Sequence, residues 1–93
     1  MILTAPAVSI NIEATVNPAN VATSPALSTQ TFTVAGVLPE HVFITGQVAA
    51  WLTDGFAVVG ASCTTACTLK LTFLNVSGGA YDAASASLKI VAL

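Results

Sequence analysis

Charged side chains are scarce in this 93-residue chain, and arginine is absent. Asp, Glu and Lys together make up 6% of the residues, against about a quarter in ordinary globular domains. The two lysines and the net charge of −2 argue against nucleic acid as a partner, because that binding needs basic side chains that displace counterions from phosphates. An anionic membrane surface is disfavoured for the same reason. The charged residues are Glu13, Glu40, Asp54, Lys70, Asp82 and Lys89.

Long apolar runs are also missing, although hydrophobic residues make up 55% of the chain. No uninterrupted stretch approaches the roughly 20 residues that span a bilayer. Residues Met1–Pro6 show no basic segment followed by a long apolar one, so no secretory signal is visible. The sequence therefore predicts no membrane partner, and the initial methionine favours a protein made in the cytoplasm.

So few charges predict a surface that is covered by another molecule. A folded protein of this size exposes on the order of 5,000 Å², which leaves roughly 800 Å² for each charge. Free monomers rarely expose contiguous apolar patches larger than a few hundred Å². Serine, threonine and asparagine cover part of this area but supply little repulsion between molecules. We expect much of the surface to lie against other copies of the chain or against another protein.

Apolar and polar residues alternate with a period of two along most of the chain, which is typical of strands with one buried face. Turn-forming residues separate the segments, and a long connection from Asn17 to about Ser28 follows the first one. The pattern predicts a single all-β domain over residues 1–93, an antiparallel β-sandwich or small barrel of about six strands. At most one helical turn is expected in each of 47–52 and 81–86. The predicted strands are 8–16, 29–34, 41–45, 56–61, 67–73 and 86–93.

The parity of each strand predicts which side chains point inward. Segment 56–61 is continuously apolar, which is typical of a strand buried on both sides. In the last segment the parity of Leu88 directs Val91 and Leu93 outward. Outward apolar residues on a terminal strand would promote aggregation of a free monomer. Val91 and Leu93 are therefore candidate interface residues. The predicted inward residues are Val8, Ile10, Ile12, Ala14, Val16, Phe32, Val34, Leu69, Leu71, Phe73, Leu88, Ile90 and Ala92.

Trp51 is the single tryptophan, and it lies beside Leu52 in the connection before Phe56. It either folds back onto the core or is covered by a neighbouring molecule. Aromatic side chains at the centre of an interface often dominate binding. Trp51 and Leu52 are therefore also candidate interface residues. If Trp51 belongs to an interface, Trp51→Ala should weaken assembly and leave the β-sheets intact.

The two cysteines, Cys63 and Cys67, are separated by three residues. A tight hairpin could bring them face to face, and a disulfide closing so short a loop would contribute about 2 kcal/mol. Free thiols packed in the core or in the turn are favoured over this bridge, since reducing cytoplasm keeps thiols free. A zinc site ranks last, because His41 is the single further soft ligand and three groups do not form a structural zinc signature.

The titratable residues do not indicate an enzyme. One histidine, four carboxylates, two lysines, one tyrosine and two cysteines are scattered over different segments, whereas catalysis needs such groups gathered in a pocket. A nucleophilic pair of His41 with Cys63 or Cys67 is conceivable, but an exposed histidine after a proline turn is ordinary. Asn75-Val-Ser77 matches a glycosylation sequon and carries no weight without a secretory signal. We expect no enzymatic activity, no cofactor, no metal and no small-molecule substrate.

The order of motifs over residues 31–93 resembles a small β-sandwich module of virion proteins from tailed bacteriophages. The chain departs from that module at Pro39-Glu40-His41 and at Trp51-Leu52. The module is defined by hydrophobic spacing, so the resemblance assigns no functional residues. The segments that carry it are Phe32-Thr-Val34-Ala-Gly36-Val37, Val59-Gly60-Ala61, Leu69-Lys-Leu-Thr-Phe-Leu-Asn75-Val-Ser77 and Leu88-Lys-Ile-Val91.

The resemblance implies a virion structural protein, most simply an oligomeric capsid decoration (cement) protein. Its implied partners are copies of itself, for example in a trimer, and the major capsid protein. Its implied location is the virion, after synthesis in the host cytoplasm. The alternatives are a phage tail or head-fibre subunit or, in another class, a secreted or surface module that binds carbohydrate or protein.

Overall fold

The computed structural model describes residues 10–93, so Val8, at the start of the first predicted strand, lies outside the described residues. Strands dominate this part of the chain, as the period-two pattern predicts, and one short helix interrupts them. The elements are β1 (Ile10–Val16), β2 (Ala26–Thr33), β3 (Phe43–Thr45), α1 (Ala49–Thr53), β4 (Phe56–Thr65), β5 (Thr68–Asn75) and β6 (Ala86–Ala92).

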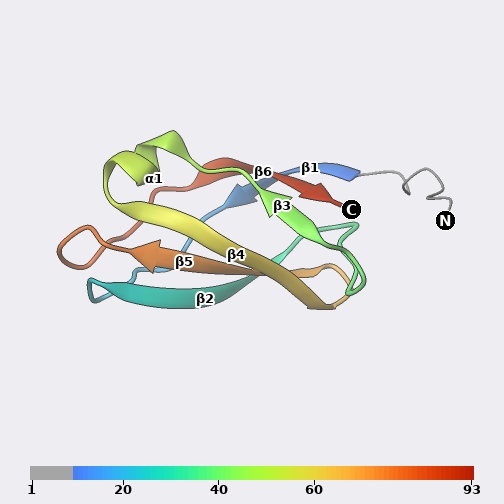
Figure 1. The fold of residues 1–93 in the computed structure, drawn as a ribbon, viewed down its shortest axis with the longest axis horizontal. Coiled ribbons are helices and arrows are strands. Elements are labelled where there is room, and N and C mark those ends of the chain that lie inside the picture. Colours follow the sequence, from blue (N-terminus) through green and yellow to red (C-terminus); the bar gives the residue numbers. More distant parts are fainter. Residues whose placement is uncertain (1–9) are drawn as a thin grey trace, which may run out of the picture.

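The strands form two three-stranded antiparallel sheets that pack face to face (Figure 1). One sheet has the order β1-β6-β3 and the other has the order β2-β5-β4. The central strands β6 and β5 each pair with two neighbours, so the four remaining strands are sheet edges. The predicted antiparallel β-sandwich is confirmed, and the small barrel considered beside it is excluded because the sheets do not close.

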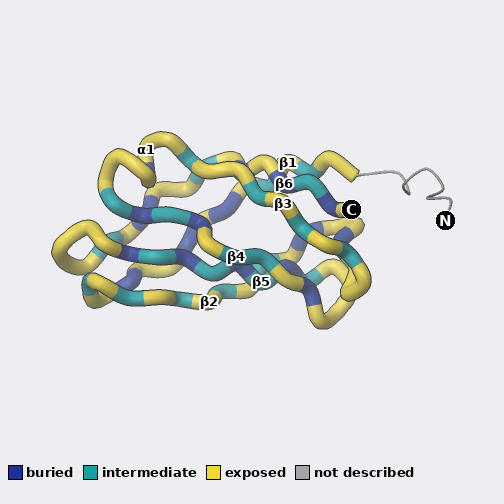
Figure 2. The backbone as a smooth tube through the Cα atoms, viewed as in Figure 1, coloured by how far each residue is buried: buried dark blue, intermediate teal, exposed yellow. Residues whose placement is uncertain are grey.

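The core lies between the sheets and follows the predicted parity. Every second residue of β5 is buried, and β6 buries Leu88, Ile90 and Ala92 (Figure 2). Each fully buried Leu, Ile or Phe contributes about 1.5–3 kcal/mol relative to an exposed one. The inward residues of β1 become more buried along the strand, from half-exposed Ile10 to fully buried Val16.

The structure corrects several of the predicted elements. β2 begins at Ala26, so the connection after β1 is shorter than the expected stretch to Ser28, and β3 begins at Phe43 rather than His41. β4 is not buried on both sides, because the described strands form two layers and the outer face of each sheet is uncovered, so Val59 on that face is half-exposed. One short helix, α1, forms within the stretch 47–52 and extends to Thr53.

Candidate functional site

An apolar patch covers one end of the outer face of the β1-β6-β3 sheet. We call the four residues Val42, Ile44, Val91 and Leu93 the outer patch. Ile44 lies directly across from Val91 in the β3–β6 pairing. Val42 and Leu93 exchange two backbone hydrogen bonds of 3.1 and 2.8 Å, which extend this pairing past the end of β3. Val42, Ile44 and Leu93 are 65%, 57% and 50% exposed, and Val91 is half-buried.

The rest of that face is polar. Glu13 of β1 pairs with Lys89 of β6, and Thr15 pairs with Ser87. The Ser87 hydroxyl donates a hydrogen bond of 2.8 Å to Glu13 Oε1. The face is therefore divided along the strand direction into a charged, hydroxyl-bearing part and the uncharged outer patch.

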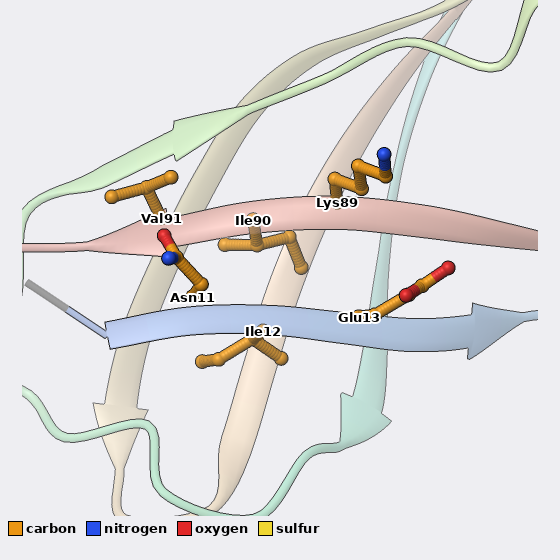
Figure 3. Close-up of a pocket in the computed structure, with 6 residues that line it drawn as sticks. All are labelled: Asn11, Ile12, Glu13, Lys89, Ile90 and Val91. Atoms are coloured by element: carbon orange, nitrogen blue, oxygen red, sulfur yellow. The ribbon is translucent and has the colours of Figure 1, made fainter.

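A hollow of about 370 Å³ lies over β1 and β6 where the two parts of this face meet. Figure 3 shows Glu13 and Lys89 at one end of the hollow and Asn11 and Val91 at the other. Val91 therefore belongs to the outer patch and also lines the hollow. The polar groups in the hollow come from three side chains of different chemistry, and their arrangement does not resemble a catalytic constellation.

The outer face of the other sheet carries mainly hydroxyl groups. Thr29, Thr31 and Thr33 point outward from β2 and are exposed. The Thr29 hydroxyl is hydrogen-bonded at 3.0 Å to the hydroxyl of Thr72, its partner on β5. Hydroxyl groups hydrogen-bond to water without adding charge. Most of this face is therefore hydrated despite the shortage of ionic side chains, although exposed Leu27 lies across from Leu74 at one end of it.

Trp51 belongs to the core and not to an interface. Its side chain is 2% exposed, its ring packs edge-to-face on Phe56 at 5.6 Å and on Phe73 at 6.1 Å, and its Nε1 donates a 3.0 Å hydrogen bond to the carbonyl of Ala84. Burying this ring gives the short helix α1 its place in the fold, because a helix of five residues is not stable alone. The interface interpretation of Trp51 was wrong, and a buried ring cannot serve as a stacking platform for sugars.

The other candidate interface residues are exposed, but the structure does not gather them in one place. Leu52 is exposed on α1, at the opposite end of the sandwich from the C-terminus (Figure 1). Val91 and Leu93 lie together in the outer patch. Sequence reasoning missed Val42 and Ile44, which complete the patch, because their position depends on the pairing of β3 with β6.

The two cysteines are free thiols in different environments. Cys63 is buried, lies across from Leu69, and its Sγ donates a 3.0 Å hydrogen bond to the carbonyl of Thr65. Cys67 is exposed at the β4–β5 turn with a φ of 64°. The tight hairpin is as predicted, but the disulfide that the spacing left open is not formed, because the two thiols do not face each other.

His41 is not close to a set of metal ligands. Its Nδ1 accepts a 3.0 Å hydrogen bond from the backbone N–H of Leu38, and its ring packs edge-to-face on Phe43 at 5.9 Å. Within residues 10–93, no three His, Cys, Asp or Glu side chains are grouped so that they could hold a metal ion. These contacts give His41 a structural role in the turn before β3.

Asn75 is a buried polar clamp at the end of β5. Its Nδ2 donates to the carbonyls of Thr23 at 2.8 Å, Gly79 at 2.9 Å and Val21 at 3.3 Å, and its Oδ1 accepts from the N–H of Ser77 at 3.0 Å. It therefore ties two connections that are distant in sequence to one strand end. Full burial also closes the sequon to glycosylation. A polar residue at an inward position of β5 was the sequence signal that could have identified this clamp.

The chain's two glutamines bind backbone groups in the way a neighbouring strand would. The N–H of Val58 donates to Gln47 Oε1 at 2.9 Å, and Gln47 Nε2 donates to the carbonyl of Val58 at 2.6 Å. Gln30 makes the same pair of hydrogen bonds with the backbone of Ala19, at 2.7 and 3.2 Å. Gln47 thereby satisfies one position on the free edge of β4, and such edges otherwise invite pairing with other chains.

Tyr81 and Asp54 form a polar contact beside α1. The Tyr81 hydroxyl donates a 2.7 Å hydrogen bond to Asp54 Oδ2. Partial burial raises the pKa of the Tyr81 hydroxyl above its ordinary 10.0, and the hydrogen bond and the negative charge of Asp54 raise this pKa further. The Tyr81 ring also packs on Phe56 at 5.0 Å, which connects this contact to the core.

The comparisons with models of known protein families, with curated protein sequences and with solved structures found no match. Within the described residues, no helix has the length and apolar character needed to cross a bilayer. The resemblance to phage virion modules therefore stays a prediction from the sequence.

Proposed function

We propose that this protein is a virion structural subunit, a capsid decoration protein that binds the major capsid protein and other copies of itself on a phage head. The observation that carries this proposal is the outer patch. Four adjacent apolar side chains, three of them exposed and Val91 half-buried, lie on an outer sheet face of a chain in which only 6% of residues are charged. Contiguous exposed apolar surface on a small protein commonly marks an interaction site.

The rest of the molecule suits a role in which the protein is held rigidly on a larger surface. Within residues 10–93, no buried side-chain nitrogen or oxygen lacks a hydrogen-bond partner. The clamps formed by Asn75 and Gln47 fix the connections to the sheets. A rigid sandwich loses little conformational entropy when it binds, so more of its contact energy is available to strengthen a shell.

Phage heads assembled with and without this chain test the proposal. We expect heads that lack it to lose resistance to heat and osmotic shock, and the added purified protein to restore it. Unchanged resistance would contradict a cementing role. The number of copies per particle separates the alternatives, because hundreds of copies indicate the head, whereas a few to dozens indicate a tail or fibre.

The remaining alternative is a secreted or surface module that binds carbohydrate or protein, and the burial of Trp51 weighs against its carbohydrate-binding form. Sugar platforms use exposed aromatic rings, and the one tryptophan is in the core. A glycan array on which the purified chain gives a reproducible signal would revive that alternative.

A further inference from the structure

We infer that the outer patch binds a second copy of this chain across a two-fold axis, with the two β1-β6-β3 sheets face to face. This inference deepens the proposed function and rests on it for the need to self-associate. The arrangement of side chains in the patch indicates that its partner is a second copy of the chain. The patch is complementary to itself, as an interface between two identical copies requires.

The first argument is the pairing of rows between β3 and β6. Ile44 lies beside Val91 in one row, and Val42 lies beside Leu93 in the next. A two-fold axis that runs parallel to the strands, midway between β3 and β6, places β6 of one copy over β3 of the other. Val91 then lies over the second copy's Ile44, and Leu93 lies over its Val42. All four resulting contacts join one aliphatic side chain to another.

The second argument comes from the charge at the border of the patch. Gly46 donates a 2.8 Å backbone hydrogen bond to the carbonyl of Lys89, so these two residues form the third row. The same axis places Lys89 over the second copy's Gly46. Glycine has no side chain, which leaves room for the lysine stem. The second copy's Lys89 lies in the same row on the neighbouring strand, and the long stems let the two ammonium groups turn apart into water. Both charges of the Glu13–Lys89 pair thus remain at the rim, where water solvates them.

The size of the contact sets the expected affinity. Standard protein interfaces bury about 800 Å² on each partner, and three rows of two strands cover less than this. Face-to-face sheets pack about 10 Å apart, so the aliphatic side chains of the outer patch can meet in the middle. We therefore expect a reversible dimer with a dissociation constant in the micromolar range.

Sedimentation equilibrium of the full chain, from micromolar to millimolar concentration, tests the dimer with a matched pair of variants. Ile44→Glu places a carboxylate in the patch. Leu27→Glu places one on β2, an edge strand of the other sheet, at a residue that is 67% exposed. Ile44→Glu should raise the dissociation constant at least about a hundredfold, because each dimer then buries two unpaired charges. Leu27→Glu should change it by less than about twofold.

A mixing experiment tests which residues face each other. Ile44→Lys and Val91→Glu should each dissociate the dimer when studied alone. Mixed in equal amounts, they should form a heterodimer that binds at least about tenfold more tightly than either variant with itself. The gain arises because the new lysine of one copy meets the new glutamate of the other. Circular dichroism of each variant verifies that it is folded.

Three results would overturn the inference: a wild-type chain that is monomeric throughout the concentration range, equal effects of Ile44→Glu and Leu27→Glu, or no heterodimer on mixing. A chain that strengthens phage heads as a monomer would overturn the dimer and leave the proposed function standing. A dimer that neither binds nor strengthens phage heads would overturn the proposed function and leave the dimer standing.

Discussion

The two ends of the sandwich handle their side chains in opposite ways. At the end around α1, Trp51 is buried against its aromatic neighbours, and Asn75 and Gln47 bind backbone groups of other segments. At the other end, Val42 and Ile44 stand exposed beside β6. We call the first the closed end and the second the open end. The closed end thus anchors its aromatic and amide side chains internally and exposes single aliphatic residues such as Leu52, whereas the open end groups four aliphatic residues on one sheet face.

The difference shows that scarcity of charge does not have one effect throughout the molecule. At the closed end, neutral side-chain amides satisfy backbone groups, and each of these hydrogen bonds contributes about 1 kcal/mol. The threonine face of β2 and β5 obtains its hydration from neutral hydroxyls. At the open end the four side chains of the outer patch are all aliphatic, and this is where we propose that a partner binds. The following predictions test this contrast, beginning with the largest effect.

Trp51→Ala should lower the free energy of unfolding by about 3–5 kcal/mol, because it removes the largest buried ring and leaves a cavity. Leu52→Ala, the adjacent exposed residue on α1, should change it by less than about 1 kcal/mol. Urea denaturation of the two variants measures both. A stable Trp51→Ala protein with impaired self-association would contradict the core assignment and place this residue in an interface.

Asn75→Ala should lower the free energy of unfolding by about 2–3 kcal/mol, since buried carbonyls lose their donor. The matched control is Asn20→Ala, at an exposed asparagine, which should be nearly neutral. Thermal unfolding followed by circular dichroism compares the two. Equal stabilities of the variants would show that the clamp does not hold the closed end together.

Gln47→Ala should cost about 1–2 kcal/mol, because two hydrogen bonds to Val58 are lost in a partly buried position. Gln30→Ala removes a similar pair of hydrogen bonds, to Ala19. These bonds are exposed although the Gln30 residue is half-buried, so water can replace them and the cost should stay below about 1 kcal/mol. Hydrogen exchange of the Val58 amide should accelerate in Gln47→Ala alone. Unchanged exchange would contradict the role of Gln47 in protecting the β4 edge.

At the open end, the double substitution Ile44→Thr and Val91→Thr should leave the unfolding free energy of the monomer within about 1 kcal/mol of wild type, because threonine favours strands and both side chains point outward. The same variant should lose self-association, since it gives this face the hydroxyl chemistry of the other sheet. Denaturation and sedimentation measure the two effects separately. A collapse of stability would mean that the patch supports the fold.

The smallest expected effect is a pH dependence at Tyr81. Its pKa is raised in the folded protein above the ordinary 10.0, so the unfolded chain loses the proton first as pH rises. The stabilisation is therefore complete below about pH 10 and is lost progressively above it. Tyr81→Phe should show a shallower loss of stability in that range, and identical profiles would contradict the assignment.

The strands and their inward faces could be predicted from the sequence, because a period of two is a local property. The alternation that buries Leu71 and Leu88 can be counted without knowledge of the partner strand. β4 was misjudged because continuous apolar character was read as burial of both faces, whereas the described strands form only two layers and Val59 lies on an outer face.

The open end could be predicted only in part. The parity of β6 directed Val91 and Leu93 outward, but Val42 and Ile44 joined them through the pairing of β3 with β6, a long-range choice of register. The contacts of the closed end were even harder to predict from the sequence. Asn75 reaches a carbonyl 54 residues away in the chain, and no local pattern encodes such a contact.

The two cysteines of the β4–β5 hairpin differ in accessibility, so their reaction rates can report on opening of the native protein. A thiol reagent can reach Cys67 in the native state, whereas Cys63 reacts only after β4 separates from the core. Alkylation of Cys67 should therefore occur in every native molecule, whereas the rate of alkylation of Cys63 should measure how often β4 opens. Followed by mass spectrometry, the delay between the two would record transient opening of the native protein without any denaturant or engineered label.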